Sequence, residues 1–160
     1  MDLEFEDRRA LIVGGSYGIG FAVARQIAAE RGDVTIVSRS DENLRRAADA
    51  IRDATGRKPA VELADVTRPE AAEDLATRIA SRWNGLDVLV TAVGGSVRAA
   101  FADLTEQQWL DNYALNVLST VRCLRALLPL LKRGTAPAVV ILGAASAKMP
   151  YAQQIVSNVH

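Results

Sequence analysis

The sequence predicts an α/β fold, with about five strands in a doubly wound parallel sheet and helices on both of its faces. Three observations favour it. Short apolar runs alternate along the chain with amphipathic helical stretches, which is the pattern of strands joined by crossover helices. The runs are rich in Val, Ile and Leu, as strands buried on both faces are. A glycine-rich turn leads directly from the first run into the first helical stretch.

Each element is indicated by its apolar spacing. The strands are expected at residues 10–13, 34–37, 60–64, 88–90 and 139–142. Between them, apolar residues recur every three or four positions, which predicts four helices with one inward face each. The expected inward residues are Ile19, Val23 and Ile27 in the first helix, Leu44, Ala47, Ala48 and Ile51 in the second, Ala72, Leu75, Ala76 and Ile79 in the third, and Leu110, Ala114, Val117, Val121, Leu124 and Leu128 in the fourth.

Two helix starts have the sequence of a capping box, in which a hydroxyl and a carboxyl or amide three residues later satisfy each other's backbone N–H groups. Thr67 and Glu70 fit this pattern, with Pro69 inside the first turn. Thr105 and Gln108 fit it as well. The third helix is therefore expected to begin after Thr67, and the fourth after Thr105.

Length and composition indicate one domain, which we expect to span residues 1–160. The chain has 19 Lys and Arg residues against 19 Asp and Glu, so no basic field exists to attract nucleic acid. The single cysteine, Cys123, excludes an intramolecular disulfide, suits a reducing compartment and is expected to be buried. The acidic N-terminus has no secretory apolar segment, and no apolar run approaches the length of a membrane span. We expect a cytoplasmic protein that binds neither nucleic acid nor membrane.

The turn after the first strand has glycines at positions 14, 18 and 20. A tight strand-to-helix turn needs backbone angles that a Cβ forbids. A pyrophosphate must also approach backbone N–H groups closely, at the positive end of the helix dipole. Because this loop follows a buried strand and opens an amphipathic helix, it predicts a cradle for the pyrophosphate of a nicotinamide dinucleotide, the alternative being a glycine turn without a ligand.

The spacing G-x-x-x-G-x-G resembles that of the short-chain dehydrogenase/reductase family, whose signature is T-G-x-x-x-G-[IL]-G. Val13 stands where the family has threonine. The resemblance covers essentially the whole chain and implies a Rossmann-like dinucleotide-binding domain. It implies cofactor contacts from Gly14, Ser16, Tyr17, Gly18, Ile19 and Gly20.

Arg39, which follows Ser38 after the second strand, bears on the choice of cofactor. An arginine can pair with a 2′-phosphate, and in the family an arginine at this place usually marks an NADP enzyme. NADP is therefore expected and NAD less so. The alternative is a solvated surface arginine.

Two later segments also resemble cofactor contacts of the family. Asp65 and Val66 stand where the family has its adenine contact, although Asp65 is equally a turn residue. The family tetrad N-N-A-G after the fourth strand is Thr91-Ala92-Val93-Gly94 here, so both asparagine side chains are absent. Contacts through the backbone of Ala92 and Gly94 are still expected.

The family's catalytic residues are only partly present. Asn116 matches the asparagine that holds a water in the proton relay, the alternative being a core residue bonded to backbone. The family serine aligns with Ala144 and the family tyrosine with Ser157, while the lysine would be residue 161. Asn116 and Ser157 are the candidate catalytic residues, because Ser157-Asn158 resembles a subgroup with Ser-Asn in place of tyrosine. Ser146, Lys148 and Tyr151 are expected to form only a polar loop.

Two functions stay open. The first is an NADP(H)-dependent short-chain oxidoreductase that acts on a carbonyl or alcohol substrate, in the manner of a 3-oxoacyl reductase. The second is a catalytically impaired cofactor-binding or scaffold protein of the same fold. The resemblance also implies a small-molecule carbonyl substrate, no metal, and a homodimer or homotetramer formed through the helix at residues 105–133.

The resemblance further implies a domain that is incomplete at its C-terminal end. The fifth strand is then an exposed edge. The tail at residues 151–160 is a candidate for the start of a further helix, and its histidine, His160, is given no catalytic role.

Overall fold

The computed structural model describes residues 4–158. The five strands in this range form a parallel sheet in the order β3-β2-β1-β4-β5. The order reverses between β1 and β4, which is the switch point of a doubly wound sheet. The predicted fold class is confirmed. The strands are β1 Arg9–Val13, β2 Asp33–Ser38, β3 Ala60–Leu63, β4 Val88–Thr91 and β5 Ala138–Ile141. The main helices are α1 Gly18–Ala29, α2 Asp41–Thr55, α3 Ala71–Arg82, α4 Glu106–Tyr113 and α5 Ser119–Leu131.

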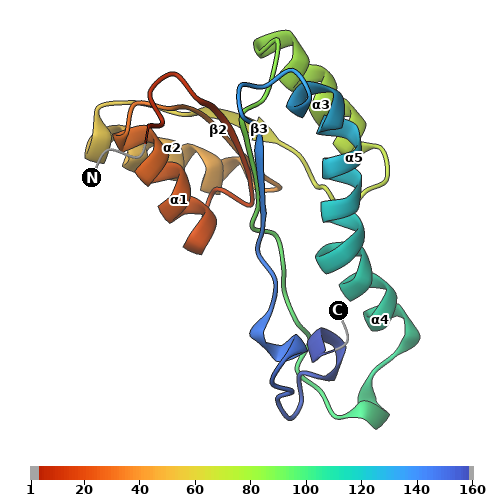
Figure 1. Cartoon of the computed structure of the whole chain (residues 1–160). Coiled ribbons are helices and arrows are strands. Elements are labelled where there is room, and N and C mark those ends of the chain that lie inside the picture. The colour runs from red at the N-terminus through yellow and green to blue at the C-terminus, as the bar shows by residue number, and fades with distance from the viewer. Residues whose placement is uncertain (1–3, 159–160) are drawn as a thin grey trace.

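Helices cover both faces of the sheet, with α1 and α2 on one side and α3 and α5 on the other (Figure 1). A hydrophobic core lies on each face of the sheet. Strand β1 contributes to both cores, because successive side chains of a strand point to opposite faces. Ala10 and Ile12 pack with α1 and α2, whereas Leu11 and Val13 pack with α3 and α5. All the residues predicted to face inward from α2 and α3 are buried, so both predictions are confirmed.

The prediction for α1 is partly wrong. Ile27 is buried, but Ile19 is largely exposed. The helix begins at Gly18, which puts Ile19 in its first turn, next to the glycine loop and away from the packed centre of the sheet.

The helical segment from α4 to α5 contains a π-turn, η2, at Ala114–Leu118. The capping box of Thr105 and Gln108 is present, as predicted. The predicted inward face is only partly confirmed, because Leu124 packs against the core but Leu110, Val121 and Leu128 are exposed. A π-turn holds one extra residue, so the apolar face before it is not continuous with the face after it. The residues that α5 buries are Ser119, Thr120, Cys123, Leu127, Leu130 and Leu131.

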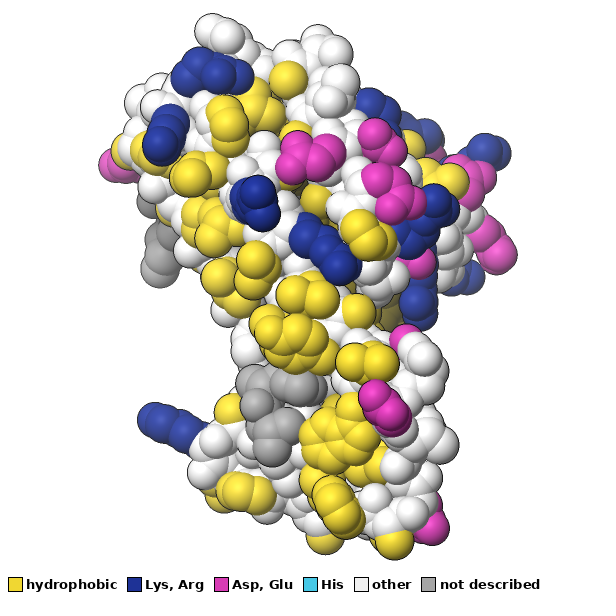
Figure 2. Space-filling model, turned by 90° about the vertical axis from the view of Figure 1, so that its right-hand side faces the viewer, with side chains coloured by type: hydrophobic (Ala, Val, Ile, Leu, Met, Phe, Trp, Pro, Cys, Tyr) yellow, Lys and Arg dark blue, Asp and Glu magenta, His cyan; other side chains and the backbone are white. Residues whose placement is uncertain are grey.

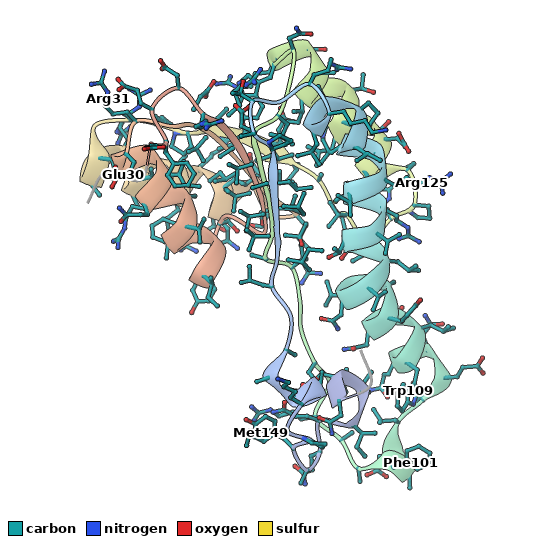
Figure 3. All side chains as sticks on the ribbon, viewed as in Figure 1. Glu30, Arg31, Phe101, Trp109, Arg125 and Met149 are labelled. Atoms are coloured by element: carbon teal, nitrogen blue, oxygen red, sulfur yellow. The ribbon has the colours of Figure 1, made fainter. Side chains whose placement is uncertain are left out.

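The same segment, Glu106–Leu131, is long and apolar enough to cross a membrane by length and composition alone. The expectation that no such stretch exists is therefore wrong. Its apolarity has another explanation, because α5 packs one side on α3 and β4 and leaves a second apolar side exposed. Figure 2 shows apolar side chains gathered over this side of the molecule. Arg125 of α5 points away from the sheet (Figure 3).

Cys123 lies on the inward side of α5, as predicted, and burial raises the pKa of its thiol to about 11. A thiol with a raised pKa carries little thiolate near neutral pH and is a poor nucleophile. Cys123 is therefore a packing residue.

The predicted capping box of Thr67 and Glu70 is wrong. The Asp65 carboxylate accepts hydrogen bonds from the Thr67 N–H at 3.1 Å and from the Thr67 hydroxyl at 2.7 Å. Asp65 thus forms a turn of its own, and Thr67 is not available as a cap. Helix α3 begins only at Ala71, without a side-chain cap, and the Glu70 carboxylate pairs with Arg68 instead.

The last strand and the tail follow only part of the prediction. All four residues of β5 are exposed, so this strand is an exposed edge, as expected. The tail forms only a short 3-10 helix at Ile155–Asn158, and His160 lies outside the described residues.

Candidate functional site

The predicted site residues gather at the carboxyl edge of the sheet, where two cavities share the loop after β4. The first, which we call the nucleotide cleft, has a volume of about 270 Å³. The second, the serine cavity, has a volume of about 610 Å³ and lies between the loop after β4 and the segment after β5. Ala92, Val93 and Gly94 line both. The switch point between β1 and β4 is therefore the place where the two cavities meet.

The nucleotide cleft brings together residues from five separate segments of the chain. Its lining includes nine of the predicted cofactor contacts: Gly14, Ser16, Tyr17, Ser38, Arg39, Asp65, Val66, Ala92 and Gly94. Gly18, Ile19 and Gly20 do not line it, because they form the first turn of α1. The cleft thus contains most of the predicted contacts, and the helix N-terminus lies beside it.

The three glycines of the loop meet different physical needs. Gly14 has φ +85°, and a Cβ there would lie 2.6 Å from the Ala92 carbonyl oxygen. A Cβ on Gly20 would lie 2.3 Å from the Gly14 carbonyl oxygen, so that glycine permits close packing of helix and strand. Gly18 has φ +58° with open space around its Cα. Of the three, only Gly18 has open space where a Cβ would lie.

Arg39 and Asp65 form the polar end of the cleft. Arg39 is exposed and makes no hydrogen bond or ion pair with any other residue from 4 to 158. The Thr67 hydroxyl lowers the pKa of Asp65, burial opposes this, and the positive charges of Arg39 and Arg68 reinforce it. Asp65 therefore stays ionised near neutral pH, and the Arg39 guanidinium is available to an anion.

Asn116 lies in the π-turn, which is a frequent feature of functional sites. Its Oδ1 accepts a hydrogen bond from the Gly95 N–H at 3.0 Å, and its Nδ2 donates to the Gly95 carbonyl at 2.9 Å. The same Nδ2 lies 2.8 Å from the side-chain oxygen of Asn112. Asn116 lines the serine cavity, but its side chain braces the loop after β4.

The serine cavity has three serines in a connected arrangement. Ser157 Oγ donates to Ser96 Oγ at 2.9 Å, and the buried Ser146 hydroxyl donates to the Ser157 carbonyl at 2.9 Å. Tyr151 also lines this cavity, contrary to the expectation of a polar loop without a role. The Asn158 side chain accepts a hydrogen bond from the Tyr151 N–H and donates one to the Tyr151 carbonyl. Because Asn158 follows Ser157 directly, these bonds hold the segment around Tyr151 near Ser157. Figure 3 shows this lower part of the molecule, with Met149 and Phe101 on its outer side.

Comparison with known protein families shows which family the chain belongs to. The family model for short chain dehydrogenase matches residues 8–156. The chain belongs to the short-chain dehydrogenase family. Its fold and glycine loop are thus those of a family of oxidoreductases, as the resemblance in the sequence implied.

Two curated relatives show how much of the family's length is covered. The chain is 34% identical to the uncharacterized oxidoreductase YciK of Escherichia coli over 138 residues, which is 84% of this chain and 54% of YciK. It is 31% identical to mouse dehydrogenase/reductase SDR family member 4 over 137 residues, which is 84% of this chain and 48% of that protein. The chain therefore spans about half the length of these relatives.

Two solved structures have the same fold. A short chain dehydrogenase from Shigella flexneri complexed with NADP superposes with a TM-score of 0.89 at 29% identity, covering 96% of this chain and 66% of that one. The L-sorbose reductase of Gluconobacter frateurii, complexed with NADPH and L-sorbose, superposes with a TM-score of 0.91 at 28% identity, covering 99% of this chain and 60% of that one.

Two features of the site were missed in the sequence. Asn112 is buried and bonded to the loop after β4, although its neighbours Asp111 and Tyr113 are exposed and suggest a solvated helix face. The only available signal was its spacing of four residues from Asn116, which puts both on one side of a helix. No local sequence pattern indicated a role for Tyr151, because this residue lines the serine cavity only as a result of how the C-terminal segment folds back.

Proposed function

We propose that residues 1–160 form one dinucleotide-binding domain that holds NADPH and reduces a small carbonyl compound, or oxidises the corresponding alcohol. The observation that supports this most is the nucleotide cleft, in which the glycine loop, the free Arg39 and the Ala92–Gly94 backbone meet at the switch point. The open space at Gly18 suits the approach of a pyrophosphate to backbone N–H groups at the start of α1. The residues present therefore fit the cofactor.

The polar residues of the two cavities have separate proposed roles. Arg39 would pair with the 2′-phosphate, and Asp65 with Val66 would contact the adenine end. Bound at this cleft, the cofactor supplies a hydride for the carbonyl carbon. A protein hydroxyl is suited to supply the proton for the carbonyl oxygen, and Ser157 and Tyr151 both carry hydroxyl groups and line the serine cavity.

Replacement of Arg39 by alanine tests the choice of cofactor. Hydrogen bonds to charged groups contribute about 1.5–3 kcal/mol, so we expect the affinity for NADPH to fall at least about tenfold. The affinity for NADH should change less than twofold, because that cofactor lacks the 2′-phosphate. Calorimetric titration of both cofactors measures the two affinities. Arg57→Ala removes an equal charge beyond the far end of α2 and serves as control, and equal losses for NADPH and NADH would contradict the role of Arg39.

Turnover tests the reaction and identifies its proton donor. We expect the protein to oxidise NADPH in the presence of a panel of ketones and 3-oxoacyl thioesters. A phenol is a stronger acid than an aliphatic alcohol, so Tyr151→Phe should lower turnover more than Ser157→Ala, by at least about 100-fold. Tyr113→Phe, on the exposed side of α4, is the matched control. Unchanged turnover in both cavity variants would show that neither hydroxyl donates the proton.

A second function is favoured by the residues at the family's catalytic positions. Ala144 has no hydroxyl, and the Ser157 hydroxyl already donates to Ser96. A cofactor-binding or scaffold protein would bind NADPH in the calorimeter but consume none with any acceptor. The same panel of carbonyl compounds therefore separates the two functions.

The exposed apolar side of α5 supports self-association. Val121 and Leu128 lie there, each about half exposed. An apolar face of this kind marks an interaction site. We propose that it joins two or four copies of the protein, and a purely monomeric protein in sedimentation equilibrium would contradict this.

A further inference from the structure

The loop after β4 is held from one side by two asparagines of the neighbouring helical segment. Asn112 Nδ2 donates to the Gly95 carbonyl at 3.1 Å, and Asn116 Nδ2 donates to the same oxygen at 2.9 Å. Asn116 Oδ1 accepts from the Gly95 N–H. Both backbone polar groups of Gly95 are therefore satisfied by side chains.

The hydrogen bonds determine a single orientation for both amides. The Gly95 N–H is only a donor, so the group facing it must be the oxygen of Asn116. Asn116 Nδ2 then faces Asn112, whose side-chain oxygen accepts from it at 2.8 Å. This leaves Asn112 Nδ2 directed at the Gly95 carbonyl. The two amides and the loop thus form one closed network, in which each member has a partner.

Asn112 differs from Asn116 in its environment. It is only 4% exposed, and a buried amide is unfavourable unless its donors and acceptors are bonded. Asn116 lines the serine cavity, whereas Asn112 lies behind the loop and does not line that cavity. Any effect of Asn112 on a ligand must therefore act through Gly95 and Asn116.

The braced loop lies where the two cavities meet. Gly94 lines both the nucleotide cleft and the serine cavity, and a Cβ on Gly94 would lie 3.1 Å from Asn116 Oδ1. The loop also lacks the two asparagine side chains of the family tetrad, since Thr91 and Ala92 stand at those two positions. The asparagines of the helical segment thus hold a loop that has no amide side chain at those positions.

We infer that Asn112 is a positioning residue, which fixes Gly94, Gly95 and Asn116 and thereby shapes the end of the cofactor site that opens into the serine cavity. This inference rests on the proposed function, in which the cofactor extends from the nucleotide cleft into that cavity. The adenosine end of the cofactor lies against Arg39 and Asp65, away from the network. Loss of Asn112 should therefore affect one end of the cofactor and not the other.

The experiment compares two ligands by calorimetry on the whole protein. NADPH reaches both cavities, whereas 2′,5′-ADP contains only the adenosine end with its 2′-phosphate. Asn112→Leu keeps the size of the side chain but removes both hydrogen bonds. We expect the affinity for NADPH to fall about tenfold, as the loss of a buried hydrogen-bond network implies, while the affinity for 2′,5′-ADP stays within twofold.

Ile79→Val, in the buried core of α3, controls for general loss of stability, because it should lower the melting temperature without changing either affinity. Asn112→Ser, which is too short to reach Gly95, replaces the leucine variant if circular dichroism shows that the latter does not fold. Equal losses for both ligands, or no loss for either, would overturn the inference while leaving the proposed function intact. If the parent protein binds neither ligand, the proposed function fails and the inference fails with it.

Discussion

Replacement of Gly18 by valine is expected to abolish NADPH binding while the protein stays folded. Gly18 has φ +58° and no atom near the position of a Cβ. A β-branched residue in this left-handed conformation costs about 1–2 kcal/mol, which is a small part of the stability of a domain. The new side chain would, however, occupy the space through which a pyrophosphate approaches the loop. We expect the affinity to fall at least about 100-fold, since several hydrogen bonds to a charged group are lost together.

Gly56 provides the matched control for this prediction. It has φ +74° and the same open surroundings, but it caps the C-terminus of α2. Gly56→Val should lower the melting temperature about as much as Gly18→Val, by about 5 °C, without any change in affinity. Titration calorimetry and thermal unfolding of both variants measure the two effects. Normal NADPH binding by Gly18→Val would show that the loop does not cradle the pyrophosphate.

The Arg9–Asp87 pair is expected to give the largest stability effect. Asp87, only 2% exposed, accepts hydrogen bonds from the Arg9 N–H at 2.9 Å and from its guanidinium at 2.8 Å, and from the Thr135 N–H at 2.6 Å. These bonds join the starts of β1 and β4 to the turn before β5. Asp87→Asn should destabilise the protein by about 3 kcal/mol, because it leaves a partly buried guanidinium unpaired. The melting temperature should fall by about 10 °C.

The same pair predicts how stability depends on pH. Burial alone would raise the pKa of Asp87, but the hydrogen bonds from Arg9 and Thr135 outweigh it and lower this pKa from 3.8 to about 2. A carboxyl whose pKa is lower in the folded state binds its proton more weakly there than in the unfolded state. Its contribution, about 2 kcal/mol, is therefore present above pH 4 and is lost as the pH falls towards 2.

Urea unfolding between pH 2 and pH 7 measures this contribution, and Asp87→Asn should remove the part of the pH dependence that comes from this carboxyl. Asp53→Asn breaks an exposed pair with Arg52 and should change the stability by less than about 1 kcal/mol. A loss for Asp87→Asn no greater than that of the control would mean that the pair contributes little.

The parts of the fold that were predictable have a single apolar face. Helices α2 and α3 each touch the sheet on one side and water on the other. The residues buried as expected are Leu44, Ala47, Ala48 and Ile51 of α2 and Ala72, Leu75, Ala76 and Ile79 of α3. The segment from α4 to α5 was predicted only in part, since it has apolar residues on two sides. Periodicity identifies an apolar stripe, but it does not distinguish the stripe that packs on the sheet from the one left exposed, such as Val121 and Leu128.

Local chemistry was predictable where one residue had one partner. Thr105 and Gln108 formed the expected capping box. Thr67 did not, because the Asp65 carboxylate, two residues earlier, is a nearer and charged acceptor for its hydroxyl and its N–H. Sequence spacing showed both candidate partners but not their relative strength.

The family, the order of the strands and helices, and the glycine loop from Gly14 to Gly20 could be predicted without the structure. The family follows from the resemblance of the motifs, and the elements and the loop follow from apolar periodicity and local backbone angles. Which polar groups meet depends instead on how distant segments pack. Asn112 and Asn116 hold Gly95 from a helix 17 and 21 residues further along the chain, and Tyr151 enters the serine cavity because the tail returns to it. Such contacts depend on the paths of distant segments, which no local pattern encodes.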